Sequence, residues 1–497
     1  MVKVKNAGRT PPVWVGIDIG TQSVRAIAAD ESGAVVASGS QPLTSSRRVG
    51  REHVQDPEEW WRAVCGACRE MMAGVDAESV RALALDATSG TILLADGDGR
   101  PASEALMYDD GRAEKEARDV AEAGGALWAE FGYRMQPSWA LPKLVWLCRN
   151  RVSDTTGLYL THQSDFIQNR LAGRRIASDW SHSLKSGYDL SRQQWPHQVF
   201  DKLGLPETIF PEVVAPGSPL GSVSRDAAEQ TALPAGVPIV AGMTDGCAAQ
   251  IAATGLRTGR WNSVLGTTLV LKGATETQLH DPHGVVYSHR APDGRWLPGG
   301  ASSTGAGSIA KHFRKEDLHQ LQAAAAKRGP TDLVVYPLHG AGERFPFAAP
   351  EAKAFQLRDP QEPAELYRAI LQGVAFLERL SFDYLKLLGT QVSGAISISG
   401  GAVRDGLWNQ IRADVLETSL TIPAVTEPAF GMAMLASSQD PSLEQVARMI
   451  RTGSRIDPVL PFAQTYGTAY RRWLRELEGR GWLPPELAAY SNRQIEV

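Results

Sequence analysis

Cysteine is scarce in this sequence, with four in 497 residues, so no disulfide framework is expected. No apolar run is long enough to cross a membrane, because Asp245 interrupts the longest one. No apolar segment follows the basic N-terminal residues, which argues against a secretory signal. The net charge of −4 gives no reason to expect nucleic acid or an anionic membrane as a partner. These absences predict a soluble, cytoplasmic protein.

Two pairs of closely spaced cysteine or histidine residues could in principle bind a metal. Cys65 and Cys68 form a pair, but they lie in a helical pattern with no second cysteine pair and no nearby histidine. His280 and His283 lie among Pro and Gly residues that are typical of a loop. We therefore expect both pairs to be structural.

The chain is long, and its composition is that of an ordinary globular protein. Its 497 residues exceed what one hydrophobic core usually supports, so two or more domains are expected. A hydrophobic content of 43% with 21% charged residues is typical of a folded globular protein. The function must therefore be sought in local motifs.

A single acid near the middle of the chain stands out. Residues 237–241 predict a buried strand, and residues 247–253 predict the start of a packed helix. Asp245 lies at the corner between them, where backbone amides face outward and a ligand can approach. Its carboxylate either acts on a ligand or merely caps the helix.

A strand, turn and strand open the chain. Residues 13–29 predict two strands joined by a tight turn at Gly20 and Thr21, with Asp18 at the end of the first strand. Such a turn offers backbone amides and a hydroxyl to a phosphate, and Asp18 could hold a metal ion that bridges phosphates. An ordinary hairpin with an acid in its turn is the alternative.

Two further polar segments follow in this half. Residues 80–95 predict a strand, a loop and a strand, and the loop, Asp86 to Gly90, is rich in donors suited to a polyhydroxylated ligand. Residues 107–112 then place two acids and an arginine before a helix that starts near Ala113. A capping acid with surface charge would also explain this cluster.

The second half repeats the opening pattern. Gly266 and Thr267 form the turn of another strand pair at residues 261–273, which suggests a duplicated fold. Residues 296–307 predict a glycine-rich loop before a helix. Residues 395–414 predict a buried strand, a turn at Gly400 to Ala402 and an amphipathic helix, where a flat ring could lie against backbone. A purely structural turn is the alternative.

Together these motifs resemble the FGGY carbohydrate kinases, which belong to the actin, hexokinase and Hsp70-like superfamily. The segments that carry the resemblance are 16–26, 242–246, 265–268, 399–414 and 426–436. The resemblance implies an α/β fold with two ribonuclease-H-like domains facing across a cleft. It implies an N-terminal sugar-binding domain at 11–256 and a C-terminal nucleotide-binding domain at 257–490.

Within the family, the chain looks most like the D-ribulose kinase group of cyanobacteria and plants. Leu106 to Asp110 and Thr161 to Asp165 are among the segments behind this choice. Typical bacterial xylulose kinases carry Gln-Met-His where this chain has Thr88 to Gly90, which argues against D-xylulose. Gln22 replaces a small hydroxyl residue that is common in the group, so the sugar itself stays open.

The resemblance also implies roles for individual residues. The acid equivalent to Asp245 is the general base that accepts the proton of the sugar's terminal hydroxyl as it attacks the γ-phosphate of ATP. Asp18 would orient Mg²⁺, directly or through water. The implied sugar contacts are Asp18, Gln22, Thr88, Ser89, Gly90, Asp110 and Asp245. The implied nucleotide contacts are Gly20, Thr21, Gly266, Thr267, Gly401, Ala402 and Asp405.

Two of these positions depart from the family pattern. Ala402 stands where a third glycine is usual, and Asp405 stands where relatives often carry Asn or Ser. The predicted activity is ATP-dependent phosphorylation of the terminal hydroxyl of a small ketose, with D-ribulose as the first choice. The alternatives are another pentulose or a pentitol (D-xylulose, L-ribulose, arabinitol or ribitol) and a non-catalytic nucleotide-binding sensor. Relatives are often dimers, so a homodimer is also expected.

Overall fold

The computed structural model describes residues 11–152, 154–438 and 444–495. The expectation about a secretory signal rests on residues 1–10, which lie outside this range. The chain divides into two compact units. Unit 1 holds residues 1–255, 289–294 and 427–450, and unit 2 holds 256–288, 295–426 and 451–497. Among the described residues, no helix is long and apolar enough to cross a membrane.

Unit 1 is built on one mixed sheet with the order β12-β13-β6-β1-β2-β3. Its strands are β1 (Val13–Ile19), β2 (Ser23–Asp30), β3 (Val35–Pro42), β6 (Val80–Ala87), β12 (Pro219–Ser222) and β13 (Pro238–Thr244). The strands β13, β6 and β1 run parallel to one another, whereas β1, β2 and β3 form an antiparallel meander. The predicted opening hairpin and the strand at 237–241 are therefore confirmed.

Helices pack against this sheet, with α1 against β2 and β3 and α14 against β1 and β6. The helices of unit 1 are α1 (Pro57–Met72), α2 (Glu114–Gly124), α3 (Ala126–Phe131), α4 (Ala140–Asn150), α5 (Gln163–Ala172), α6 (Trp180–Ser183), α7 (His197–Leu203), α8 (Arg225–Thr231), α9 (Asp245–Thr254), α14 (Pro428–Ser437) and α15 (Glu444–Arg448). A smaller sheet joins β4 (Arg47–Val49), β5 (Glu52–Gln55), β8 (Ala105–Leu106), β7 (Ile92–Ala95) and β9 (Tyr159–His162). The short strands β10 (Ser178–Asp179) and β11 (Val213–Val214) pair with each other.

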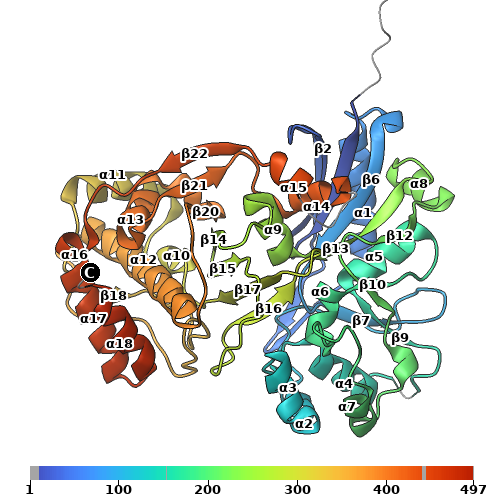
Figure 1. The fold of residues 1–497 in the computed structure, drawn as a ribbon, viewed down its shortest axis with the longest axis horizontal. Coiled ribbons are helices and arrows are strands. Elements are labelled where there is room, and N and C mark those ends of the chain that lie inside the picture. Colours follow the sequence, from blue (N-terminus) through green and yellow to red (C-terminus); the bar gives the residue numbers. More distant parts are fainter. Residues whose placement is uncertain (1–10, 153, 439–443, 496–497) are drawn as a thin grey trace, which may run out of the picture. The chain divides into compact units, whose positions relative to one another are not determined.

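The helix α14 lies against β1 although the two are more than 400 positions apart in the sequence (Figure 1). The helix is buried on all sides, and its backbone comes so close that a side chain at Gly16 of β1 would meet the Ala429 carbonyl oxygen at 1.7 Å. The sequence prediction had placed residues 257–490 in one C-terminal domain, and those boundaries stay a prediction.

Unit 2 repeats the strand pattern of unit 1. Its sheet contains, in spatial order, β16 (Tyr287–Arg290), β17 (Trp296–Ala301), β15 (Leu269–Gly273), β14 (Trp261–Leu265), β20 (Ile396–Ser399), β21 (Leu420–Pro423) and β22 (Thr452–Ile456). As in the order β3-β2-β1-β6-β13-β12, an antiparallel meander is followed by parallel strands and an antiparallel edge strand. The five strands from β17 to β21 share their order and directions with β3 to β13, which confirms the duplicated fold predicted from the two Gly-Thr turns. The edges differ, because β22 follows β21 in the chain whereas β12 precedes β13, and β16 has no counterpart in the sheet of unit 1.

The helices of unit 2 follow the antiparallel strands β14, β15 and β17 in the sequence. They are α10 (Gly307–His312), α11 (Leu318–Arg328), α12 (Pro363–Leu387), α13 (Gly406–Leu416), α16 (Phe462–Thr465), α17 (Gly467–Gly479) and α18 (Pro485–Arg493). The strands β18 (Val335–Tyr336) and β19 (Phe355–Gln356) form a separate pair. The long helix α12 packs against α11, α13 and α18 and supplies much of the hydrophobic core of this unit.

One local prediction was wrong. Residues 296–301 form the strand β17 rather than a loop, and they pair antiparallel with β15. Gly299 and Gly300 make this possible because a side chain at Gly299 would meet the Leu271 carbonyl oxygen at 2.5 Å and one at Gly300 would meet the Phe345 ring at 2.3 Å. The glycines therefore serve close packing within a sheet, which local composition does not reveal.

A buried ion pair links α12 to α13 within unit 2. Arg412 donates through Nε to Oε2 of Glu378 at 2.7 Å, and both side chains are fully buried. Ser263 of β14 donates to Oε1 of Glu378 at 2.6 Å. Because every charge here is removed from water, each partner depends on the other for its solvation.

Replacing Glu378 by alanine leaves the Arg412 charge buried without its counter-ion. We expect Glu378→Ala to lower the free energy of unfolding by about 3–5 kcal/mol. Urea denaturation followed by circular dichroism measures the change. The control is Glu476→Ala, which breaks the exposed pair with Arg480 and should change stability little. Equal shifts in the two variants would contradict the prediction.

Candidate active site

Three acids meet at the carboxyl edge of the parallel strands in unit 1. Asp18 on β1 lies opposite Asp86 on β6, and Met243 on β13 lies opposite Asp86 on its other side. Asp245 comes two residues after Met243, as the first residue of α9. Ligands of open α/β sheets bind outside this edge, where the strands end and the loops diverge. The strand-to-helix corner predicted around Asp245 is therefore confirmed.

Thr244 and Asp245 form the start of α9 at this corner. Thr244 is the N-cap residue of α9, and Asp245 follows it with a half-buried side chain. The Asp245 Oδ1 atom accepts the Gly246 backbone N–H at 2.7 Å. One oxygen of the carboxylate is thus oriented by the helix terminus, which also favours the negative charge.

The acids influence one another through burial and repulsion. Burial, together with the charges of Asp245 and Glu427, raises the pKa of Asp18 to about 6 against the opposing effects of Asp86 and Arg25. Burial also raises the pKa of Asp86 well above its ordinary value, and the charges of Asp18 and Asp245 add to this effect. The charged form of Asp86 is therefore strongly disfavoured, and both of its carboxyl oxygens are buried without a hydrogen-bond partner among the described residues.

Asp86 is the site residue that the sequence prediction missed. It begins the donor-rich loop that the sequence singled out, but it was not assigned a role. The signal that could have found it is its place: like Asp18, it comes at the end of a buried strand, and neighbouring parallel strands end at one edge.

A divalent cation fits this donor set. Among residues 11–152, 154–438 and 444–495, no group of three or more His, Cys, Asp or Glu side chains has the geometry to hold a metal by itself. Mg²⁺ usually keeps several waters and takes only one or two carboxylates together with substrate phosphates. Asp18, whose raised pKa reflects burial near other acids, is a suitable single carboxylate for such an ion.

In both Gly-Thr turns the glycine amide forms a hydrogen bond within its own turn. The Gly20 N–H donates to the Ser23 carbonyl at 3.1 Å, and the Gly266 N–H donates to the Thr268 carbonyl at 3.1 Å. These two amides close the hairpins rather than standing open to a phosphate. The surroundings of Gly266 are open, since a side chain there would meet no atom within 4 Å.

The other residues of these turns are accessible. Thr21 is half-buried, and its carbonyl accepts a hydrogen bond from Gln55 Nε2 at 2.7 Å. The side chains of Gln22 and Thr267 are exposed. Contact of these turns with phosphate or sugar stays a prediction.

The loop from Thr88 to Gly90 is held in place from behind. The Thr88 hydroxyl donates to Gln163 Oε1 at 2.7 Å and is therefore turned into the protein. Lys185 Nζ donates to the Ser89 carbonyl at 2.9 Å, and Lys143 Nζ donates to the Gly90 carbonyl at 2.6 Å. These contacts fix the loop backbone.

Lys143, the buried lysine that contacts this loop, has an unusually low pKa. Lys143 also donates to the Met107 carbonyl at 2.7 Å, so it joins the loop to the segment that carries Asp110. Burial lowers the pKa of Lys143 to about 7, although the charge of Asp110 acts in the opposite direction. The Ser89 hydroxyl is buried and has no hydrogen-bond partner among the described residues.

Asp110 is neither a cap nor a surface charge. It is fully buried, and its Oδ2 accepts from Arg112 at 2.7 Å and from the His53 N–H at 2.7 Å. The helix α2 begins after Ala113 without a side-chain cap. The capping alternative is therefore wrong, and the carboxylate holds two segments of unit 1 together.

Unit 2 has a cavity of about 430 Å³ lined by residues of α10, α11 and α12, by the turn that follows β20 and by the start of α13. The residues lining it include Phe313, Leu318, Tyr367, Gly401, Ala402 and Asp405. Its volume lies within the roughly 300–1,000 Å³ of ligand sites, and its walls are mostly apolar. Gly401 is exposed at the rim, and a side chain there would meet no atom within 4 Å.

Asp405 at this cavity is engaged by the protein itself. As the N-cap of α13, its Oδ1 accepts from the Trp408 N–H at 3.0 Å, and it also accepts from Gln322 Nε2 at 2.7 Å. Its Oδ2 accepts from the Tyr367 hydroxyl at 2.7 Å. Since a carboxylate offers about four acceptor positions, little capacity remains for a ligand.

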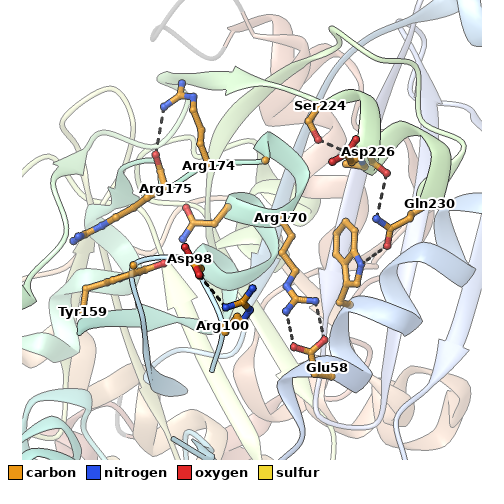
Figure 2. A pocket seen from close by; sticks show the side chains of 16 residues that line it. Glu58, Asp98, Arg100, Tyr159, Arg170, Arg174, Arg175, Ser224, Asp226 and Gln230 are labelled. Atoms are coloured by element: carbon orange, nitrogen blue, oxygen red, sulfur yellow. Dashed lines mark hydrogen bonds and ion pairs between the residues drawn. The ribbon is translucent and has the colours of Figure 1, made fainter. Parts of the chain in front are cut away.

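A second cavity in unit 1, of about 700 Å³, is lined by several arginines but does not form a convergent site. Glu58 binds Arg170 through two hydrogen bonds, of 2.5 and 2.8 Å. Figure 2 shows the guanidinium groups of Arg174 and Arg175 on different sides of this cavity, where each donates to a backbone carbonyl. This cavity lies apart from the acids at the sheet edge.

Comparison with known proteins gives a uniform result. Residues 13–252 match the N-terminal domain, and residues 261–439 the C-terminal domain, of the FGGY family of carbohydrate kinases. The chain is 28% identical over 443 residues to a xylulose kinase of Klebsiella pneumoniae, covering 85% of this chain and 89% of that protein. It is 29% identical over 471 residues to a xylulose kinase of Streptomyces rubiginosus, covering 90% and 92%. The structure resembles that of xylulose kinase from Rhodospirillum rubrum, with a TM-score of 0.83, 25% identity and coverage of 94% and 98%.

The acid cluster predicts a pH-dependent effect on stability. Because burial raises the Asp86 pKa in the folded state, the unfolded chain binds fewer protons above the ordinary value of 3.8, and stability falls as pH rises. We expect Asp86→Asn to be more stable than the wild type at pH 7, with the gain disappearing near pH 4. Urea denaturation at both pH values measures this.

The matched control is the exposed acid Asp201 on α7, whose replacement Asp201→Asn should change stability little at either pH. A destabilised Asp86→Asn at pH 7, or a gain that persists unchanged at pH 4, would contradict the prediction.

Proposed function

Because the chain belongs to the FGGY family of carbohydrate kinases and is an ATP-dependent sugar phosphotransferase, we propose that Asp245 is its general base and that its acceptor is a small ketose. The single observation that supports this proposal is the meeting of Asp18, Asp86 and Asp245 at one sheet edge. A base and a carboxylate for a phosphate-bound cation are the two charged groups that this chemistry needs.

Asp245 is suited to the role of base by its position. Its carboxylate is half-buried, one oxygen is oriented by the Gly246 amide, and its charge adds to the pKa rise of Asp18 and Asp86. In the proposed step it accepts the proton of the sugar's terminal hydroxyl while that oxygen attacks the γ-phosphorus of ATP. The bond between the γ-phosphorus and the β,γ-bridging oxygen breaks, and ADP leaves.

Asp18 would hold Mg²⁺, with a protonated Asp86 opposite it on the neighbouring strand. Bound Mg²⁺ neutralises charge on the transferring phosphoryl group. Asp86 thereby lets Asp18 bear a full charge at an edge where three carboxylates would otherwise repel one another.

For the nucleotide, we propose that Gly401 and Ala402 form the wall against which the adenosine lies. Ala402 is buried, whereas Gly401 leaves the rim open. Asp405 shapes this wall through Gln322, Tyr367 and Trp408 more than by contacting adenine. Phosphate contacts by Thr21, Gly266 and Thr267 stay predictions from the sequence.

For the sugar, we propose contacts by Ser89, Gly90 and Gln22, with Thr88 and Asp110 serving the loop behind them. The sequence of the Thr88 to Gly90 loop argues against D-xylulose, and the resemblance to the D-ribulose kinase group makes D-ribulose the first candidate. The relatives named xylulose kinases make D-xylulose the second candidate. A homodimer stays a prediction.

Removal of the base tests the mechanism. We expect Asp245→Asn to lower kcat by about a hundred- to ten-thousand-fold with a small change in the KM for ATP, since the amide keeps the shape but cannot accept the proton. A coupled assay of ADP release measures both parameters. Asp201→Asn serves as control and should retain wild-type turnover. Near-wild-type turnover of Asp245→Asn would mean that another group is the base.

The choice of sugar is tested by a substrate panel. We expect the highest kcat/KM with D-ribulose among D-ribulose, D-xylulose, L-ribulose, arabinitol and ribitol, because the loop at Thr88 lacks the Gln-Met-His of typical xylulose kinases. The same ADP-release assay applies, with phosphorylated product identified by mass spectrometry. A higher kcat/KM with D-xylulose would overturn the D-ribulose proposal and leave the kinase activity intact.

A further inference from the structure

A buried polar network lies beside the strand that leads to the base. It comprises Asp179 at the end of β10, Ser181 and His182 on α6, and Thr244 at the end of β13. We infer that Asp179, Ser181 and His182 are positioning residues that fix where β13 ends and hence where the Asp245 carboxylate lies. This inference rests on the proposed role of Asp245 as the base.

The direction of the hydrogen bonds follows from donor counting. Asp179 Oδ1 accepts from the Ser181 hydroxyl at 2.5 Å and from the Ser181 N–H at 2.8 Å. A serine hydroxyl has one proton, which is used here. Ser181 Oγ can therefore act only as acceptor toward the Thr244 N–H, which lies 3.0 Å away. The Asp179 carboxylate thus commits Ser181 to holding the Thr244 amide.

His182 fixes the second oxygen of the same carboxylate. Its Nδ1 lies 2.5 Å from Asp179 Oδ2, and its own N–H donates to Oδ1 at 3.1 Å. Both side chains are essentially inaccessible to solvent. With both oxygens engaged, the carboxylate cannot rotate, so Oδ1 stays directed at Ser181.

The atom that this network holds is close to the chemistry. Thr244 lies opposite Ala87 in the parallel pairing of β13 with β6, one residue beyond Asp86. It is also the N-cap residue of α9, and Asp245 follows it directly. Rotation of the backbone at Thr244 would swing the Asp245 side chain, and misplacement by about 1 Å can cost about a hundredfold in rate.

The hydrogen bond to Thr244 distinguishes Ser181 from a neighbouring serine that is equally buried. The Ser181 hydroxyl reaches across 63 positions of sequence to a backbone amide next to the base. Ser183, two residues further on the same short helix, is equally buried, but its hydroxyl has no partner among the described residues. A positioning role therefore predicts different kinetic effects at two equally buried serines.

The test compares Ser181→Ala with Ser183→Ala in the full-length enzyme. We expect Ser181→Ala to lower kcat about ten- to hundredfold, with KM values for ATP and sugar changed less than about twofold. Ser183→Ala should keep the wild-type kcat. Thermal denaturation of both variants shows whether either loss reflects unfolding, and Asp179→Asn is a second variant that should also lower kcat.

Hydrogen exchange gives a readout that does not depend on turnover. We expect faster exchange in a peptide spanning residues 240–246 in Ser181→Ala and wild-type exchange in Ser183→Ala, because only the former loses the acceptor of the Thr244 amide. A wild-type kcat in Ser181→Ala, equal losses in both serine variants, or a change confined to KM would overturn the inference. Unchanged turnover in Asp245→Asn would instead overturn the proposed base.

Discussion

The repulsion among buried carboxylates at one sheet edge is the constraint around which unit 1 is built. Asp18, Asp86 and Asp245 come together because β1, β6 and β13 are parallel and end at the same level. Burial would make three charges there very costly, and it accordingly raises the pKa values of Asp18 and Asp86. The same burial that disfavours a charge also strengthens the attraction of a charged carboxylate for a cation.

The surroundings of this edge consist of fixed backbone. Lysine side chains hold the carbonyls of Ser89 and Gly90, and the Ser181 hydroxyl holds the amide of Thr244. The loops that would meet a sugar are therefore restrained from behind, which limits the reorganisation required when substrate binds. The cavity of unit 2 is restrained in the same way, because Asp405 accepts hydrogen bonds from Gln322, Tyr367 and Trp408.

Close packing explains why distant segments belong to one unit. The helix α14 contacts β1 at Gly16, and a side chain at Gly431 would meet the Ala248 carbonyl oxygen of α9 at 2.1 Å. Small residues at these contacts let an entirely apolar helix lie directly on the sheet that carries Asp18. A change in the packing of α14 would therefore be felt at the active-site strands, although the helix itself bears none of the three acids.

The sequence by itself determined the hairpins, the strand-to-helix corner at Asp245, the duplicated topology and the kinase family, because alternating patterns, glycine turns and short motifs are local. Only the tertiary structure decided what depends on distant partners. It made β17 a strand through pairing with β15, placed α14 in unit 1, and buried Asp110 against Arg112. It also brought Asp86 beside Asp18 and Ser181 beside Thr244, since neither register nor side-chain direction across a fold is written in any single segment.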